Sequence, residues 1–251
     1  MPLLLTGVVT VENTNEPLSS EVFEKLRQVS TSTLATQLYR RGFRQPALPG
    51  VRPLSQVVNG FVGIAFTMRF IPVREDVDTL DPYRSGNTLQ WDAIENVPPG
   101  HVIVVDSRGD ASAASGGDIL MTRAMVRGAA GFVTDGGLRD AHVLASLPFA
   151  TYARTVTITT RAAFHHVADL QVPIGCAGVA VYPGDVLVGD RDGVVVVPRS
   201  IAAEIARPAL EQERLEAYLH TRIQAGEPLW GVYPPSEQTL ADYRQATFKE
   251  V

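Results

Sequence analysis

The sequence contains almost no lysine. Two of its 22 basic side chains are lysines, Lys25 and Lys249, and all the others are arginines. An enzyme that forms a Schiff base needs a lysine held in a desolvated pocket. Lys25 lies in a polar stretch that predicts an exposed helix, and Lys249 lies at the C-terminal end of the sequence. We therefore expect no Schiff-base chemistry.

Four further absences narrow the class of protein. The single cysteine, Cys176, cannot form an internal disulfide, which is typical of a reducing compartment. No run of about 18 apolar residues is present, and the first residues lack the basic segment of a signal peptide. The net charge is -5, whereas nucleic-acid binding requires clustered positive charge. We expect a cytoplasmic protein without membrane or nucleic-acid partners.

Common motifs for zinc and for serine nucleophiles are also missing. The sequence has no HExxH or CxxC spacing, and no G-x-S-x-G elbow around residues 112–115. His165 and His166 are neighbours, and on a helix they would diverge by about 100°, so they are not expected to share a metal. Cys176 lies in an apolar run that predicts a buried strand. The isolated histidines are interpreted as structural: His101, His142 and His220. His142 is the exception that could take part in a site, because it lies two residues after Asp140.

The chain has 251 residues, 45% of them hydrophobic, which suffices for a globular protein that buries roughly 70% of its unfolded surface. Helices and strands mix without a strict βαβ alternation, so we expect a layered α/β domain. We assign residues 1–200 to this domain, including a loose arm over 1–17 and a loop over 74–88, and residues 201–251 to a C-terminal helical extension. The expected strands are 60–73, 101–106, 132–135, 149–153, 156–160, 173–181, 186–189 and 194–197. The expected helices are 20–29, 31–41, 88–95, 118–127, a short one opened by residues 139–140, and 200–226, kinked or broken at Pro208.

A di-glycine segment, GGDIL at residues 116–120, precedes a predicted helix. Glycines let a backbone approach a ligand closely, and the free N–H groups of Asp118, Ile119 and Leu120 would point at that ligand. The helix N-terminus adds roughly half a positive charge. The segment predicts an anion site that suits a small carboxylate. The alternative is an ordinary tight turn before a helix.

A second di-glycine segment, GGLRD at residues 136–140, follows a predicted strand, where α/β folds place ligands. Arg139 offers a planar fork that binds a carboxylate or an enolate oxygen. Asp140 is a hard oxygen ligand that suits Mg²⁺ or Mn²⁺. The alternative is a local salt bridge in which Asp140 caps a helix. A third acidic stretch, Asp190–Gly193, has metal-binding residue types, but its Asp-Gly pair is more typical of a hairpin.

These segments resemble one protein family. The resemblance rests on GGDIL at 116–120, on GAAGFVTDGGLRD at 128–140 and on PGDVLVGDRDGVVVVP at 183–198, and it covers roughly residues 25–200. The family joins 4-hydroxy-4-methyl-2-oxoglutarate and 4-carboxy-4-hydroxy-2-oxoadipate aldolases with regulators of ribonuclease E activity (RraA-like proteins). Some members have been misnamed as methyltransferases, but the chain has no strand–GxG loop for S-adenosylmethionine.

The resemblance implies an α/β fold with a layered β-sandwich or barrel-like core flanked by helices. It also implies a homo-oligomer, a trimer or a hexamer, with a divalent-metal site between subunits. By motif position, Arg139 resembles the catalytic and substrate-binding arginine and Asp140 the ligand of Mg²⁺ (or Mn²⁺). The amides of Gly117, Asp118, Ile119 and Leu120 would bind the carboxylate of a pyruvyl group. Val143 departs from the family pattern, because many members carry an acidic residue there.

Three functions follow as hypotheses. The first is a metal-dependent lyase that cleaves a 4-hydroxy-2-oxo acid through a pyruvate enolate, which also forms when oxaloacetate loses carbon dioxide. The second is a ribonuclease-binding regulator without chemistry. The third is a hydro-lyase that acts on a sugar-derived acid through the same enolate. The scarcity of lysine agrees with a metal, rather than an imine, as the electron sink.

Overall fold

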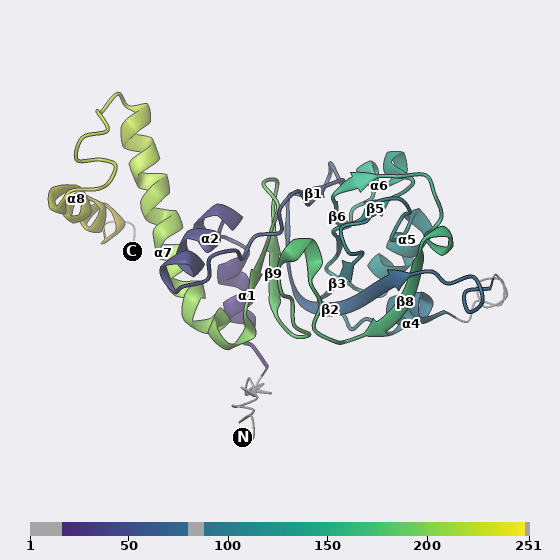
Figure 1. Cartoon of the computed structure of the whole chain (residues 1–251). Coiled ribbons are helices and arrows are strands. Elements are labelled where there is room, and N and C mark those ends of the chain that lie inside the picture. Colours follow the sequence, from purple (N-terminus) through teal and green to yellow (C-terminus); the bar gives the residue numbers. More distant parts are fainter. Residues whose placement is uncertain (1–16, 80–87, 249–251) are drawn as a thin grey trace, which may run out of the picture.

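The structure is a computed structural model that describes residues 17–79 and 88–248 (Figure 1). Nearly all of the arm expected over residues 1–17, and residues 80–87 of the loop expected over 74–88, lie outside the described residues.

The main domain is built around an eight-stranded mixed sheet in the order β1-β6-β4-β3-β2-β9-β10, with β8 also paired to β2. Leu48 donates to Val194 O at 2.9 Å and Val196 donates to Pro46 O at 2.8 Å, so the segment before β1 pairs with β10 and nearly closes the sheet into a barrel. The strands of this sheet are β1 (Arg52–Pro53), β2 (Phe61–Pro72), β3 (His101–Asp106), β4 (Gly131–Thr134), β6 (Ala150–Ala153), β8 (His165–Leu170), β9 (Val186–Gly189) and β10 (Val194–Val197). A separate two-stranded sheet pairs β5 (Gly137–Leu138) with β7 (Thr155–Val156).

Helices cover this sheet on its outer faces (Figure 1). The helices are α1 (Ser20–Leu26), α2 (Thr31–Arg40), α4 (Leu89–Asn96), α5 (Asp118–Val126), α6 (Ala141–Ser146), α7 (Arg199–Gln224) and α8 (Glu237–Phe248), with short 3-10 turns η1 (Arg161–Ala163) and η2 (Cys176–Gly178). Strands β2, β3, β4 and β6 run parallel, and α4, α5 and α6 lie in the three connections between them. The centre of the chain therefore does follow a βαβ alternation, which the sequence patterns did not reveal.

Strand β3 separates two apolar clusters of the core, one inside the barrel and one beneath the helices α4 and α5. Its Val-Ile-Val-Val run is buried on both faces, as expected for a central parallel strand. Val102 and Val104 face the barrel interior with Tyr152 and Leu187, while Ile103 and Val105 pack against α4 and α5. A third apolar cluster joins α1, α2 and the first half of α7 to the outer face of β9 and β10.

Most expected elements match the structure within a few residues, but the strand expected over 173–181 is wrong. This stretch forms the turn η2, and only Ile174 and Val181 pair with each other, as an isolated bridge. Ala177 and Gly178 have φ values of 51° and 79°, which break an extended strand. Cys176 is fully buried, as predicted, but it lies in this turn rather than in a strand.

His165 and His166 begin strand β8 and do not lie on a helix, which was the case considered in the sequence argument. Neighbouring side chains on a strand point to opposite faces, so the conclusion that the pair cannot share a metal still holds. His165 is buried, whereas His166 pairs with Asp78. The strand expected over 156–160 is shorter than predicted and ends at Val156.

Helix α7 passes through Pro208 without a break and projects beyond the domain, where α8 folds back beside it (Figure 1). A proline in a helix removes one bond to the carbonyl four residues earlier. That residue is Glu204, which is exposed, so water can satisfy its carbonyl group. We call residues 211–248 the C-terminal arm.

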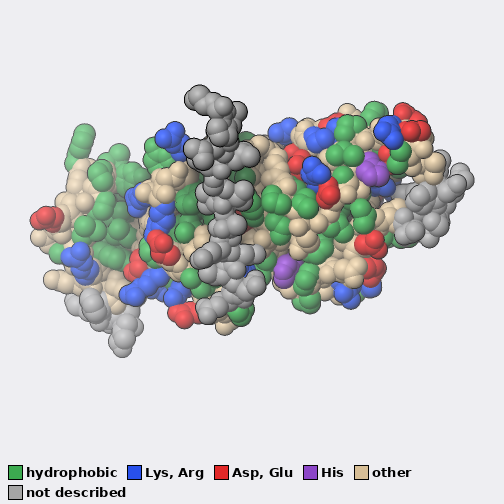
Figure 2. All heavy atoms as spheres, turned by 60° about the horizontal axis from the view of Figure 1, so that its bottom comes forward, with side chains coloured by type: hydrophobic (Ala, Val, Ile, Leu, Met, Phe, Trp, Pro, Cys, Tyr) green, Lys and Arg blue, Asp and Glu red, His purple; other side chains and the backbone are tan. Residues whose placement is uncertain are grey.

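Hydrophobic side chains gather on the surface of the C-terminal arm (Figure 2). Trp230 is 91% exposed, and Leu229 and Tyr233 are exposed as well. Within residues 17–79 and 88–248, we find no helix with the length and apolar character needed to span a bilayer.

Candidate functional site

A small cavity of about 140 Å³ lies at the N-terminus of α5. It is smaller than the roughly 300–1,000 Å³ clefts that hold drug-sized ligands, so it suits a small acid. Arg139 lines it together with all four of the residues predicted to bind a carboxylate, Gly117 to Leu120. The other lining residues are Gln90, Trp91, Ala114, Gly116, Thr160 and Arg161.

Three chain segments run side by side to form this site. Ser115 N donates to Gly137 O at 2.7 Å, and Arg139 N donates to Gly116 O at 3.1 Å. On the other side of β5, Thr157 N donates to Leu138 O at 3.0 Å. The two di-glycine segments are therefore joined by backbone bonds, which bring the start of α5 against Arg139 and Asp140.

The glycines permit this close approach. A Cβ atom on Gly136 would lie 2.7 Å from Ser107 Cβ, and one on Gly137 would lie 2.5 Å from Thr157 Cγ2. A Cβ on Gly116 would lie 2.8 Å from Met121 Cε. The sequence argument assigned the glycines at 116 and 117 to ligand approach, whereas in the structure they make room for neighbouring protein groups.

Asp140 has an unusual backbone and an unusual side-chain role. It occupies the N-cap position of α6 with φ 61° and ψ 35°, a left-handed conformation that aspartate tolerates better than most residues. Its carboxylate makes no cap bond to α6. Oδ2 instead accepts from Asp118 N at 3.3 Å and from Arg139 Nε at 3.2 Å. The structural alternative is therefore present in both its parts: Asp140 forms a salt bridge with Arg139, and its carboxylate caps the first amide of α5 rather than an amide of α6.

The amides at the start of α5 already hold carboxylates of the protein itself. Asp118 N binds Asp140, and Ile119 N donates to the Asp118 side chain at 2.7 Å. The helix N-terminus thus attracts negative charge, as its dipole predicts. A substrate carboxylate at Ile119 N would have to displace the Asp118 side chain, which is partly exposed and able to rotate.

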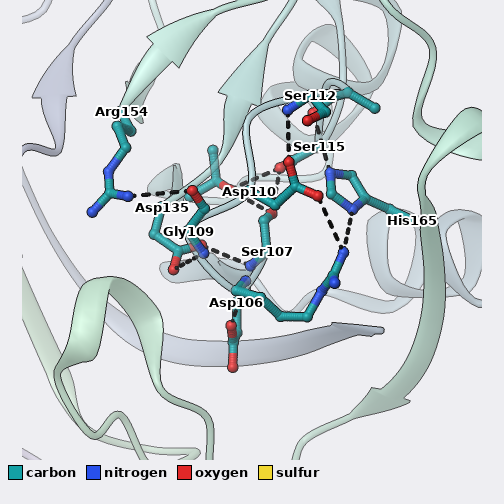
Figure 3. Close-up of polar contacts among 12 residues, drawn as sticks. Asp106, Ser107, Gly109, Asp110, Ser112, Ser115, Asp135, Arg154 and His165 are labelled. Carbon is teal, nitrogen blue, oxygen red and sulfur yellow. Dashed lines mark hydrogen bonds and ion pairs between the residues drawn. The ribbon is translucent and has the colours of Figure 1, made fainter. Parts of the chain in front are cut away.

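A buried polar network around Ser107, Ser115 and Asp135 lies next to the first di-glycine segment (Figure 3). The hydroxyl groups of Ser107, Ser115 and Thr134 form a closed triangle with oxygen–oxygen distances of 2.7, 2.8 and 3.1 Å. All three residues are fully buried, and Thr134 Oγ1 also accepts from Gly136 N at 3.0 Å. The triangle ties the end of β3 and the end of β4 to the residue before the first di-glycine segment.

Asp135 supports the same region from the end of β4. It accepts three backbone N–H bonds, from Ser107 at 2.7 Å, Gly109 at 2.9 Å and Ala177 at 3.0 Å. Burial raises the pKa of this carboxyl group above its ordinary value, although the three bonds oppose the shift. Asp135 is thus a structural anchor for the loop after β3 and for the turn η2.

His165 is a buried histidine among the polar contacts drawn in Figure 3. Its Nε2 lies 3.2 Å from Ala113 O, and its Nδ1 lies 3.1 Å from Arg108 Nη2. Because the carbonyl group can only accept and the guanidinium can only donate, the imidazole carries its proton on Nε2. Burial lowers the pKa of His165 below its ordinary value.

Two lining residues were not singled out by sequence reasoning. Arg161 donates through Nε to Gln90 Oε1 at 3.0 Å, and Gln90 donates through Nε2 to Ser115 O at 2.7 Å. Neither residue stands in a glycine-rich or charged motif. The only available signal was an arginine shortly after a predicted strand.

The remaining sequence candidates have structural roles or lie elsewhere. Asp190–Gly193 forms the expected hairpin, and the Asp190 carboxylate accepts from both Thr31 N and Thr31 Oγ1 at 2.8 Å, which anchors the start of α2. His142 is exposed on α6.

A larger hollow of about 930 Å³ lies between residues 42–46 and 179–185, away from Arg139 and Asp140.

A profile of the RraA-like family, described as Aldolase/RraA, matches residues 31–196. The chain belongs to this family. A relative from Halalkalibacterium halodurans, named "Putative 4-hydroxy-4-methyl-2-oxoglutarate aldolase", is 32% identical over 166 residues, which cover 64% of this chain and 78% of the relative.

Two solved structures share this RraA-like fold. One is an uncharacterized protein from Pseudomonas syringae pv. tomato, with a TM-score of 0.75, 28% identity, and coverage of 87% of this chain and 99% of that protein. The other is RraAS2 from Streptomyces coelicolor, described as an unusual member of the RNase ES inhibitor RraA protein family. It has a TM-score of 0.74 and 33% identity, and the match covers 82% of this chain and all of RraAS2.

The site of this RraA-like chain fits a divalent metal only if water and substrate supply most of the metal's ligands. In the part of the chain that the structure describes, no group of three or more His, Cys, Asp or Glu side chains could enclose a metal ion. Mg²⁺ usually keeps several waters and binds through one or two carboxylates together with substrate oxygens. Asp140, whose side chain is 30% exposed beside the cavity, offers one such oxygen donor. The residues fit Mg²⁺ or Mn²⁺ held by Asp140, water and substrate, and they do not form a closed protein cage.

Proposed function

We propose that the protein is a divalent-metal-dependent lyase that cleaves a C–C bond of a 4-hydroxy-2-oxo acid and releases pyruvate. The observation that carries the proposal is that Arg139 and the N-terminus of α5 line one cavity of about 140 Å³, while the Asp140 carboxylate, which is not part of the lining, is hydrogen-bonded to both of them. Membership of a family that contains proteins named as aldolases supports the lyase class.

The helix N-terminus supplies the site for the substrate carboxylate. In the proposed complex the carboxylate binds the amides of Gly117–Leu120, where it replaces the Asp118 side chain at Ile119 N and the Asp140 side chain at Asp118 N. The positive end of α5 favours this exchange of one carboxylate for another. The 2-oxo group then faces Arg139, which lines the same cavity.

Arg139 stabilises the charge that develops as the C–C bond breaks. A water molecule takes up the proton of the 4-hydroxyl group and later delivers it to C3. As the C3–C4 bond breaks, C4 becomes the carbonyl carbon of the second product, the C3–C4 electron pair forms a C2=C3 double bond, and the π pair of the ketone moves onto its oxygen. The guanidinium donates to that oxygen as it gains negative charge, and protonation at C3 then yields pyruvate. Bound Mg²⁺ or Mn²⁺ at Asp140 would supply Lewis-acid stabilisation of the same oxygen. Decarboxylation of oxaloacetate passes through the same enolate and is expected as a second activity.

A ribonuclease-binding regulator is the alternative that the description of the Streptomyces coelicolor structure favours. It requires no chemistry at the cavity. A hydro-lyase that acts on a sugar-derived acid would use the same Arg139 and Asp140 groups.

Pyruvate release from a panel of 2-oxo acids tests the proposal. The panel contains oxaloacetate, 4-hydroxy-2-oxo acids and sugar-derived acids, each with Mg²⁺, with Mn²⁺ and with excess chelator. We expect metal-dependent pyruvate release from the 4-hydroxy-2-oxo acids that disappears in Arg139→Ala. Dehydration without C–C cleavage would favour the hydro-lyase. Inactivity on the whole panel, together with binding to a ribonuclease, would favour the regulator.

A further inference from the structure

Arg108 has a backbone conformation that is unfavourable for an arginine. Its φ angle is 62°, and that of the next residue, Gly109, is 66°. Asp110 N donates to Ser107 O at 3.0 Å, which closes a tight turn directly after β3. Turns with two positive φ angles favour glycine, asparagine and aspartate, because the Cβ atom of other residues is crowded there. An arginine at this strained position points to a role for its side chain.

The Arg108 guanidinium contacts a histidine and a carboxylate (Figure 3). Its Nη2 donates to His165 Nδ1 at 3.1 Å and lies 3.5 Å from Asp110 Oδ2. His165 is fully buried, and its ring packs against Phe70 with the centroids 5.4 Å apart. Because a guanidinium can only donate, His165 Nδ1 accepts and the imidazole proton is held on Nε2. Arg108 therefore selects the tautomer of His165.

His165 in turn holds two parts of the cavity wall. Its Nε2 donates to Ala113 O at 3.2 Å, and the next residue, Ala114, lines the cavity. Its backbone oxygen accepts from Nη1 of Arg161, which also lines the cavity. Ala114 N donates to Thr159 O at 2.9 Å, so the two parts of the wall are joined to each other as well. The position of the imidazole thus bears on the shape of the cavity.

We propose that Arg108 and His165 are positioning residues for the candidate site: Arg108 fixes the tautomer of His165, and His165 holds the cavity wall in the form that binds substrate. Neither residue lines the cavity, so both act without touching the substrate. The inference rests on the proposed function for the identity of the ligand, a 2-oxo acid. A purely structural pair would change the stability of the fold and leave the affinity of the cavity unchanged.

Arg108→Gly tests the inference by direct binding. Glycine adopts the left-handed backbone freely, so the turn is kept while the guanidinium is lost. Titration calorimetry with pyruvate at pH 7, in the presence of Mg²⁺, measures the affinity. We expect the Kd to rise about 3- to 10-fold, the usual worth of one hydrogen bond. The melting temperature should stay close to that of wild type, and Arg108→Lys, which keeps a donor, should restore part of the affinity.

A double-mutant cycle shows whether Arg108 acts through His165. His165→Gln should also raise the Kd for pyruvate, and adding Arg108→Gly to it should have little further effect. Nuclear magnetic resonance of the protein with ¹⁵N-labelled histidine reads the tautomer directly, and His165→Gln identifies the His165 signal by its loss. We expect the proton on Nε2 in wild type and a mixture of tautomers in Arg108→Gly.

Gln171→Gly is the matched control. Gln171 also has a positive φ angle, 55°, and its Oε1 accepts from Thr67 N at 2.9 Å, but it does not line the cavity. This variant removes a hydrogen-bonded side chain from a left-handed residue and should bind pyruvate like wild type. An unchanged Kd in Arg108→Gly, an equal rise in Gln171→Gly, additive effects in the cycle, an unchanged tautomer, or no binding of pyruvate by wild type overturns the inference.

Turnover separates this inference from the proposed function. On a 4-hydroxy-2-oxo acid, Arg108→Gly should raise KM with kcat little changed, whereas a loss of folded protein would lower kcat and leave KM unchanged. Pyruvate release with wild-type KM in Arg108→Gly would uphold the lyase and refute the positioning pair. Absence of pyruvate release from every acid, with pyruvate binding that depends on Arg108, would refute the lyase and uphold the positioning pair.

Discussion

Gly117 and Asp140 are in such close contact that no side chain fits between them. A Cβ atom on Gly117 would lie 2.4 Å from Asp140 Oδ2 and 2.9 Å from Arg139 Nε. The φ angle of Gly117 is -144°, which any residue can adopt, so steric contact rather than backbone conformation requires glycine here. The start of α5 and the Arg-Asp pair therefore form one unit.

Gly117→Ala is expected to impair this unit while leaving the fold intact. The added methyl group must push Asp140 and Arg139 away from the α5 amides, and we expect pyruvate release to fall at least tenfold. Gly175→Ala is the control, because its Cβ would have its nearest neighbour at 3.9 Å. Kinetics and thermal melting of both variants test this. Wild-type kcat/KM in Gly117→Ala would show that the contact does not matter for activity.

Arg139→Ala is expected to lower kcat/KM by about 10²–10³, the usual cost of removing one preorganised donor to a developing oxyanion. Arg139→Lys should also be severely impaired, because lysine keeps the charge but loses the planar fork. Steady-state kinetics on oxaloacetate and on a 4-hydroxy-2-oxo diacid measure both effects. Unchanged kcat/KM for Arg139→Ala on every active substrate would contradict the assignment of this site.

Asp140→Ala is expected to abolish activity, because Asp140 is the proposed protein ligand of the metal. Its side chain is partly exposed and makes no cap bond to α6, so the loss of fold stability should be small. Activity assays with added Mg²⁺ or Mn²⁺, and circular dichroism, test the two statements separately. Full activity of this variant, or of wild type in excess chelator, would refute metal dependence.

His165 predicts a loss of stability in mild acid. Burial lowers its pKa in the folded protein, whereas the unfolded chain has a value near 6.5. As the pH falls below about 6.5, the unfolded chain takes up a proton that the folded protein does not, so the free energy of unfolding decreases. This decrease ends at the pKa of the folded protein, below which both states are protonated.

Denaturant unfolding at pH 7 and pH 5 measures this effect of pH. His165→Gln should be less stable at pH 7 but should lose less stability between the two values than wild type. His142→Gln, at an exposed position on α6, serves as the control and should follow wild type. Equal losses in wild type and His165→Gln would contradict the prediction.

The C-terminal arm predicts a homo-oligomer, most simply the trimer that the family resemblance implies. Trp230 and Tyr233 are 91% and 64% exposed in the single chain. Burial of each ring against a neighbouring subunit would contribute roughly 1.5–3 kcal/mol. Light scattering should give about three or six times the chain mass of 27.1 kDa, and Trp230→Ser should shift the equilibrium toward smaller species. A monomer at micromolar concentration would refute this.

The sequence alone determined those features that depend on residues close to one another along the chain. Ser30 caps α2 by accepting from Thr33 N, and β3 has the bounds that its apolar run predicts. The two di-glycine segments marked the place where Arg139 meets the α5 N-terminus. These signals are local, because caps, strand patterns and glycine turns are encoded within a few residues.

Only the tertiary structure decided which distant groups meet. The hydrogen bond from Asp118 N to Asp140 joins residues that are 22 positions apart in the chain. The hydrogen bond from Arg161 to Gln90 joins residues that are 71 positions apart. The stretch 173–181 reads as a strand from its apolar residues, yet it turns, because Asp135 holds Ala177 N and backbone φ becomes positive at Ala177 and Gly178. Such contacts depend on how the parallel strands align their ends, and strand alignment is set by packing across the whole barrel rather than by any local pattern.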